Sequence, residues 1–106
     1  MTLEEIKELI ASGEKINVEF KESRDSLNKD IFNSICSFNN CNGGHIFLGV
    51  NDNGQIIGVK KEAVDKIIKD LTTSINNPQK IFPPLYLVPK TIEIDGKIII
   101  YKSSWR

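Results

Sequence analysis

Apolar and polar residues follow two different periods along the chain, and the changes of period predict its elements. Thr2-Leu3-Glu4-Glu5 fits a capping box, and the apolar residues after it recur at helical spacing as far as Gly13. We therefore predict a short helix that Gly13 ends. Residues 16–20 then alternate with period two, which predicts a strand on which Glu19 points away from the apolar face.

A helical period returns from about Ser26, and Gly43-Gly44 follows it, so a second helix is expected between them. Residues 45–50 form an almost continuous apolar run, which is typical of a central strand covered on both faces. A strand, helix, strand order allows a right-handed crossover. The strands at 16–20 and 45–50 can therefore form a parallel pair.

Two turn signals in the second half predict hairpins. Asn51-Asp52-Asn53-Gly54 predicts that residues 55–59 return as an antiparallel strand, and Asp95-Gly96 predicts a hairpin between residues 86–94 and 97–101. A third helix is expected to begin near Lys61, because apolar residues again recur at helical spacing. Asn76-Asn77-Pro78 is expected to close it.

The predicted element order is α-β-α-β-β-α-β-β. This order indicates an α/β (α+β) fold, in which helices pack on a mixed β-sheet. The length of 106 residues, 40% of them hydrophobic, fits a single domain that spans residues 1–106. No internal repeat, low-complexity tract or interdomain linker divides it.

The cysteine content and the length of the apolar runs indicate the cellular compartment of the protein. Two cysteines do not make the disulfide framework of a small secreted domain, and Met1 leads into Thr2-Leu3-Glu4-Glu5 rather than into a signal peptide. The apolar runs are far shorter than the roughly 20 residues that a membrane-spanning helix needs. We expect a cytoplasmic protein with no membrane partner.

Charge is balanced overall but not along the chain. The 14 Lys and Arg residues offset the 14 Asp and Glu residues, so the net charge favours neither a nucleic-acid nor a membrane partner. Residues 1–53 carry five basic against nine acidic residues, and residues 54–106 carry nine against five. On the third helix, acidic residues precede lysines by four positions, as Glu62 precedes Lys66 and Asp65 precedes Lys69. This spacing predicts ion pairs along one face.

Three segments in a fixed order carry a family resemblance. Residues 17–23 read NVEFKES, residues 37–44 read SFNNCNGG, and residues 46–54 read IFLGVNDNG before Ile57-Gly58-Val59. Over roughly residues 14–101 the chain resembles the Schlafen-type AlbA-like domain family. The resemblance implies a nucleic-acid-binding domain, for DNA or RNA, of a bacterial transcriptional regulator or an ATPase-linked protein.

Binding of a phosphate backbone requires cations gathered on one face. Lys21 and Arg24 flank the strand motif that the family shares, and two lysines open the third helix. The expected phosphate contacts are Lys21, Arg24, Lys60 and Lys61.

Asn40 occupies the asparagine position of the family. Its amide could bond to the backbone around Gly44 or reach a base. The family pattern places alanine and threonine beside this asparagine, whereas Asn39 and Cys41 stand here. These differences alter the rim of a nucleic-acid site without removing its framework.

Eukaryotic Schlafen relatives suggest an enzymatic alternative, because their domain is a metal-dependent ribonuclease with three carboxylates. In this sequence, the three carboxylate positions of the motif correspond to Glu14, Glu19 and Asp52, which could hold Mg²⁺ or Mn²⁺. Glu14 must then lie in a loop before the strand of Glu19, since an odd separation would put the two on opposite faces of one strand. Without nuclease activity, no cofactor is expected.

Structural explanations of the same three acids stay open. Glu14 could be a solvated loop residue, Glu19 could pair with Lys21, and Asp52 could form an Asx turn. A further alternative is a domain that contacts only protein, as a homo-oligomer.

Overall fold

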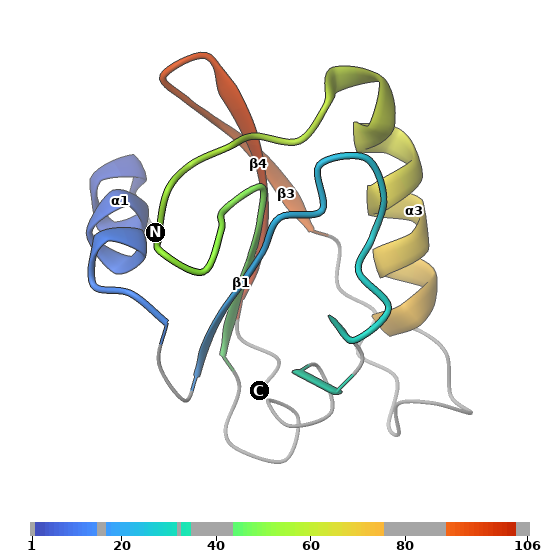
Figure 1. Ribbon diagram of the computed structural model, residues 1–106, viewed down its shortest axis with the longest axis horizontal. Coiled ribbons are helices and arrows are strands. Elements are labelled where there is room, and N and C mark those ends of the chain that lie inside the picture. The colour runs from blue at the N-terminus through green and yellow to red at the C-terminus, as the bar shows by residue number, and fades with distance from the viewer. Residues whose placement is uncertain (1, 15–16, 32, 35–43, 76–88, 104–106) are drawn as a thin grey trace.

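The computed structural model describes residues 2–14, 17–31, 33–34, 44–75 and 89–103. Among these residues, four strands form one mixed sheet in the spatial order β1-β2-β4-β3, and α1 and α3 lie on opposite faces of it (Figure 1). The elements in chain order are α1 (Leu3–Ala11), β1 (Val18–Lys21), β2 (His45–Leu48), the short 3-10 helix η1 (Lys61–Ala63), α3 (Val64–Ile75), β3 (Lys90–Ile94) and β4 (Lys97–Ser103). The predicted α+β class is confirmed.

Helix α1 forms where its capping box predicts it. The Thr2 hydroxyl accepts from the Glu5 amide at 3.2 Å, and the Glu5 carboxylate accepts from the Thr2 amide at 2.9 Å. Both bonds satisfy amides that the first turn leaves free. The helix ends at Ala11, and Gly13 follows with φ of +85°, a conformation that glycine adopts at little cost.

Strands β1 and β2 are parallel neighbours, as the element order allows, with Phe20 opposite Phe47. Strand β2 lies between β1 and β4, and Ile46, Phe47 and Leu48 are fully buried. A strand covered on both faces has no polar side, which explains its continuous apolar run.

The hairpin of β3 and β4 turns at Asp95-Gly96, as predicted. Asp95 has φ of +51° and Gly96 has φ of +78°, as a two-residue type I′ turn requires. Strand β3 begins at Lys90, and residues 86–88 of the predicted strand lie outside the described residues.

Residues 55–59 turn back antiparallel after the Asn51–Gly54 turn, but they do not form the predicted strand. They make two isolated bridges instead, Val50–Ile56 and Val59–Ile98. Gly58 interrupts the extended backbone with φ of +87°, so the segment leaves β2 and crosses to β4. The bridge to Ile98 holds Val59 against β4.

The second helix begins later than Ser26. Helical backbone appears at Ile31, and residues 23–28 form a loop closed by Asn28, whose side-chain oxygen accepts from the Ser23 amide at 3.2 Å and the Ser23 hydroxyl at 2.6 Å. Asparagine side chains compete with helical hydrogen bonds in this way. Most of this predicted helix, with Gly43, and the closing residues 76–78 of the third helix lie outside the described residues.

The core has one part on each face of the sheet. On one face, Ile67 and Leu71 of α3 pack with Ile46, Leu48 and Ile100. On the other face, residues of α1 pack against an aromatic row in which Phe47 stacks on Tyr101 with ring centroids 4.8 Å apart. The described helices include none long and apolar enough to span a membrane.

Candidate nucleic-acid interface

Three segments distant in sequence meet beside the turn of the β3–β4 hairpin. The Lys60 amide donates to the Arg24 carbonyl at 2.9 Å, and the Val59 amide donates to the Ile98 carbonyl at 2.8 Å. These backbone bonds fix the loop after β1 and the segment before η1 against the hairpin. The side chains that they carry therefore share one surface.

This surface contains a cleft of about 350 Å³, which we call the basic cleft. The segment 57–59 forms part of its wall. Its charged lining side chains are Arg24, Lys60, Lys61, Lys97 and Glu93. The structure thus brings together three of the four predicted phosphate-binding cations and adds a fourth, Lys97.

Sequence reasoning did not select Lys97. The residue directly follows the Asp95-Gly96 turn, so its place in the hairpin was predictable. Its place in the cleft was not, because this depends on the bridge between Val59 and Ile98. In the cleft, the Lys97 ammonium donates to the Ile56 carbonyl at 3.1 Å.

The cleft retains positive charge after its internal pairing. The Lys60 ammonium lies 2.7 Å from an Asp25 carboxylate oxygen, and both side chains are exposed. Such a solvent-exposed pair is weak and screened by salt. Arg24 and Lys61 form no ion pair with any described residue, so both are open to an anion.

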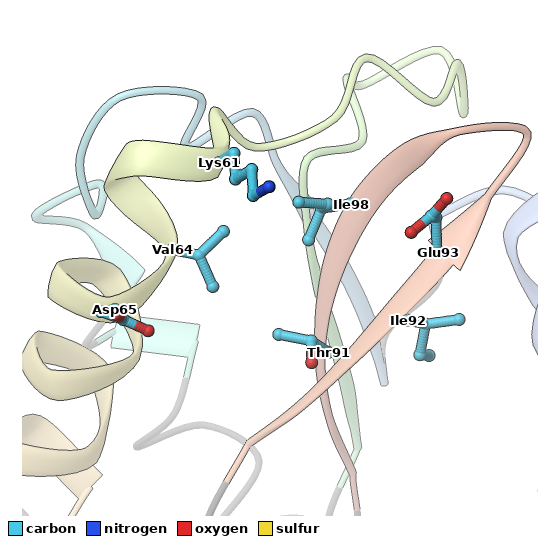
Figure 2. Close-up of a pocket in the computed structure, with 7 residues that line it drawn as sticks. All are labelled: Lys61, Val64, Asp65, Thr91, Ile92, Glu93 and Ile98. Atoms are coloured by element: carbon cyan, nitrogen blue, oxygen red, sulfur yellow. The ribbon is translucent and has the colours of Figure 1, made fainter.

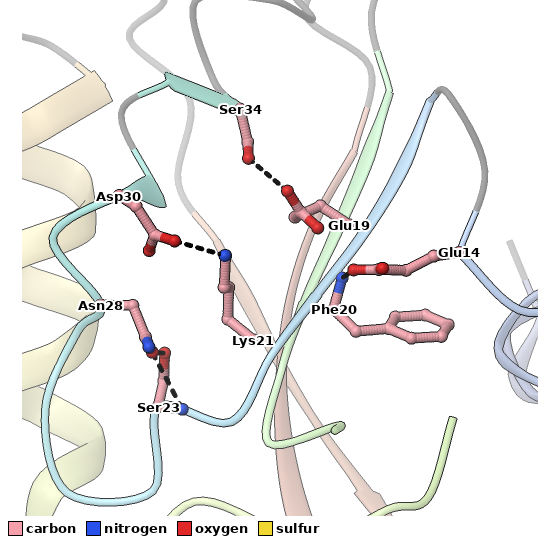
Figure 3. Close-up of polar contacts among 8 residues, drawn as sticks. All are labelled: Glu14, Glu19, Phe20, Lys21, Ser23, Asn28, Asp30 and Ser34. Atoms are coloured by element: carbon pink, nitrogen blue, oxygen red, sulfur yellow. Dashed lines mark hydrogen bonds and ion pairs between the residues drawn. The ribbon is translucent and has the colours of Figure 1, made fainter. Parts of the chain in front are cut away.

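Lys21 lies outside the basic cleft. Its ammonium is 2.7 Å from an Asp30 carboxylate oxygen, and only 19% of its side chain is exposed (Figure 3). Burial lowers the pKa of Lys21, but the hydrogen bond to Asp30 and the charge of Glu19 outweigh it and leave the pKa raised. Lys21 is thus held within the protein, unlike the other predicted cations. Asn40 lies outside the described residues.

Glu14 lies in the loop before β1, as its spacing from Glu19 requires. Its carboxylate accepts from the Phe20 amide at 3.0 Å, and the Glu19 carboxylate accepts from the Ser34 hydroxyl at 2.5 Å (Figure 3). Both acids are therefore engaged in the fold. Glu14 is therefore not a freely solvated loop residue. Glu19 does not form the ion pair with Lys21 that was the simplest structural explanation for it.

The two carboxylates also bond to one another. A hydrogen bond to Glu19 raises the pKa of Glu14, and burial raises it further. Burial raises the pKa of Glu19 as well, but hydrogen bonds from Glu14 and Ser34 outweigh it and leave that pKa lowered. The two carboxyl groups therefore titrate as a coupled pair, in which Glu14 is the weaker acid and Glu19 the stronger one.

Asp52 belongs to the same edge of the molecule but not to the pair. Its charge raises the pKa of Glu14, although its own side chain is exposed. The Asx turn expected of Asp52 is made by Asn51, whose side-chain oxygen accepts from the amides of Asn53 and Gln55 at 3.0 and 2.9 Å.

The three predicted metal ligands do not form a metal site as arranged here. Within the described parts of the chain, no group of three or more His, Cys, Asp or Glu side chains could hold a metal ion. One oxygen of Glu14 is occupied by a backbone amide, and Glu14 and Glu19 are hydrogen-bonded to each other. A hard divalent cation requires several free oxygen ligands around one point.

The predicted ion pairs on α3 are not formed. The ion pairs between described residues are Lys21–Asp30 and Lys60–Asp25, so Lys66 and Lys69 have none. Both lysines are exposed and face solvent outside the basic cleft. Exposed helical pairs contribute little, which is why the spacing alone does not ensure them.

Comparison with protein families identifies the domain. A family model described as Schlafen, AlbA_2 matches residues 14–103. The chain belongs to this family. The match begins at Glu14 and ends with β4, so the whole described sheet lies within the Schlafen AlbA_2 domain.

A solved structure shares this fold. The NMR structure of the N-terminal domain of a protein related to the ATP-dependent DNA helicase RecG, from Nitrosomonas europaea, superimposes with a TM-score of 0.67 at 19% sequence identity. The alignment covers 92% of this chain and 68% of that domain. At this identity, the likeness supports the fold alone. Comparison with curated proteins gives no significant match.

Proposed function

We propose that this Schlafen AlbA_2 domain binds DNA or RNA through the basic cleft, as the nucleic-acid-binding part of a transcriptional regulator or an ATPase-linked protein. One observation supports the proposal above all. Arg24, Lys60 and Lys61, from two separate segments, line one cleft with Lys97 of the hairpin. The helicase-related protein that shares the fold is consistent with a nucleic-acid-associated role.

Clustering matters here because the whole chain has zero net charge. A neutral protein does not attract a polyanion through its total charge, so attraction must come from a local excess of cations. Four cations and one carboxylate line the basic cleft. Phosphate groups placed there would meet the cations from three sides of one concave surface.

Fluorescence anisotropy with labelled single-stranded RNA, single-stranded DNA and duplex DNA tests the proposal. The double variant Arg24→Ala/Lys61→Ala is expected to weaken binding about tenfold or more, near 1.4 kcal/mol, because two unpaired cations leave the cleft. The matched control is Lys66→Ala/Lys69→Ala, which removes the same charge from α3. Equal losses in both variants, or no binding by the parent protein, would contradict the proposal.

The Glu14–Glu19 pair favours a second candidate, a metal-dependent ribonuclease that uses Glu14, Glu19 and Asp52. Its support is the hydrogen-bonded pair of acids at one edge of the sheet, with the charge of Asp52 close enough to raise the pKa of Glu14. Because these residues do not form a three-ligand metal group, we derive no cleavage step from them. Incubation of labelled RNA with and without Mn²⁺ separates the candidates. Cleavage that needs Mn²⁺ and is lost in Glu19→Gln supports the nuclease, and intact RNA opposes it.

A protein-only homo-oligomer is the remaining alternative. Light scattering of the chain across a range of concentrations, with and without an oligonucleotide, distinguishes it from nucleic-acid binding. Self-association in a chain that binds no oligonucleotide would favour that alternative over the basic cleft.

A further inference from the structure

A second concave region adjoins the basic cleft, between α3 and the β3–β4 hairpin. Its volume is about 420 Å³, and we call it the hairpin slot (Figure 2). Lys61, Glu93 and Ile98 line both regions. The slot and the basic cleft therefore lie side by side, so one ligand could reach both.

The register of the hairpin determines which side chains face the slot. Glu93 lies opposite Ile98, and Thr91 lies opposite Ile100, a core residue packed with α3. Because directly opposed residues share a face, Thr91, Glu93 and Ile98 are all on the α3 side of the sheet. Figure 2 shows Val64 of α3 pointing toward Thr91 and Ile98 across the slot.

The slot combines apolar walls with unpaired polar groups. Val64 and Ile98 are half-buried and provide apolar contact on opposite sides. The carboxylates of Glu93 and Asp65 also line it, and neither forms an ion pair with any described residue. Lys61 adds an ammonium group at the boundary with the basic cleft.

We infer that the hairpin slot takes one unpaired guanine of a single-stranded nucleic acid whose phosphates lie in the basic cleft. The inference rests on the proposed nucleic-acid binding. It adds that the ligand is single-stranded and that guanine is the base recognised. A nucleobase has apolar faces and a polar edge, which matches apolar walls with carboxylates beside them. A base stacked inside a duplex could not enter, so the ligand is single-stranded.

The polar groups select guanine among the four bases. The Watson–Crick edge of guanine has two adjacent donor groups, N1–H and N2–H₂, which match the two oxygens of one carboxylate. Its O6 acceptor lies next to N1–H and can accept from the Lys61 ammonium, which lines the same slot. Uracil has one donor between two acceptors, so it leaves one carboxylate oxygen unmatched.

The test uses single-stranded RNA hexamers of uridine that carry one central guanosine, inosine or adenosine, with the all-uridine hexamer as reference. The guanosine hexamer is expected to bind about fivefold tighter or more than the others, the lower limit for a bidentate base contact. Inosine lacks the N2 amino group, so comparison of the guanosine and inosine hexamers measures what the second donor group contributes to binding. The guanosine hexamer annealed to its complement should lose the preference.

Glu93→Gln identifies the residue that reads the base. An amide offers one acceptor in place of two, so the guanosine hexamer should lose its extra affinity and bind like the other three, whose affinities stay equal or rise because a negative charge leaves the cleft. Glu62→Gln is the matched control, since Glu62 is exposed and does not line the slot. Thermal melting of both variants checks that they fold.

The outcomes separate this inference from the proposed function. Equal, salt-sensitive binding of all four hexamers would leave the proposed function intact and overturn the guanine reading. A guanosine preference that survives in a folded Glu93→Gln variant would also overturn it, and so would duplex binding as tight as single-strand binding. Failure of every oligonucleotide to bind would contradict the proposed function itself.

Discussion

Glu14 shows how one side chain serves the fold and shapes the chemistry nearby. Strand β1 is an edge of the sheet, and the Phe20 amide on it donates to the Glu14 carboxylate rather than to another strand. Uncovered edge amides invite pairing with a second chain, so Glu14 protects this edge. The same carboxyl group is hydrogen-bonded to Glu19, which raises its pKa. Its structural role is therefore independent of any metal.

The pH dependence of stability follows from the opposite shifts of the pair. Glu14 has a raised folded-state pKa, so its contribution to stability is present below the ordinary glutamate pKa of about 4.3 and is lost as the pH rises through the raised value. Glu19 has a lowered pKa, so its contribution is lost as the pH falls through that value. Glu14→Gln keeps an acceptor for Phe20 but cannot ionise. We expect its free energy of unfolding to fall less than that of the parent as the pH rises from about 4 to 7.

Urea unfolding at several pH values measures this difference. Glu22→Gln is the control, because Glu22 is exposed and outside the pair. If the parent and Glu14→Gln lose stability in parallel, the pKa of Glu14 is not raised in the folded protein.

At the scale of elements, the glycines around residues 49–58 direct the chain from the sheet to the cleft. Gly49 ends β2 with φ of +96°, and its carbonyl accepts from the amides of Ile57 and Gly58. A Cβ on Gly49 would lie 3.1 Å from the Ile98 carbonyl oxygen and 3.2 Å from the Val59 nitrogen. Backbone from two other segments therefore needs the space that a side chain would fill.

Gly49 and Gly96 have similar φ, so alanine substitutions at these two positions distinguish backbone strain from steric crowding. Gly49→Ala is expected to lower the free energy of unfolding by about 3 kcal/mol, since it adds backbone crowding to a left-handed penalty of about 1–2 kcal/mol. Gly96→Ala should show only that penalty, because no atom lies within 4 Å of its Cβ position. Denaturant unfolding of both variants measures the difference, and equal losses would show that the crossing at Gly49 is not tight.

At the scale of the whole molecule, a chain of zero net charge presents a concentrated positive surface. The acidic pair lies on β1 and its preceding loop, whereas the basic cleft lies beside the β3–β4 hairpin, and β1 and β3 are opposite edges of the sheet. The folding of the chain thus places the Glu14–Glu19 pair away from the basic cleft. A polyanion can approach the cleft without meeting the paired acids first.

Salt dependence measures how many cations contact phosphate. For single strands the slope of log affinity against log salt changes by about 0.7 for each phosphate contact, because each contact releases counterions. Lys61→Ala is expected to reduce the slope by about that amount, whereas Lys66→Ala, on the exposed face of α3, should leave it unchanged. Identical slopes for the two variants would place the phosphates elsewhere.

Local patterns predicted most elements because their causes are local. The capping box, the Asp95-Gly96 turn and the apolar run of β2 depend on residues within a few positions of one another. Predictions were wrong where another contact competes with the expected element. Residues 55–59 leave the expected hairpin for a bridge to Ile98, and the Asn28 side chain holds the loop in which a helix was expected to start.

Sequence by itself determined the family, the class of fold and three of the four cleft cations, because motifs, periodicity and residue type are properties of the chain. Only the tertiary structure decided that Lys97 joins Arg24 and Lys61, that Lys21 turns inward to Asp30, and that Glu14 is hydrogen-bonded to Glu19. The physical reason is distance. Charge interactions act between side chains within several ångströms, and pairing across the sheet sets those distances for residues far apart in sequence.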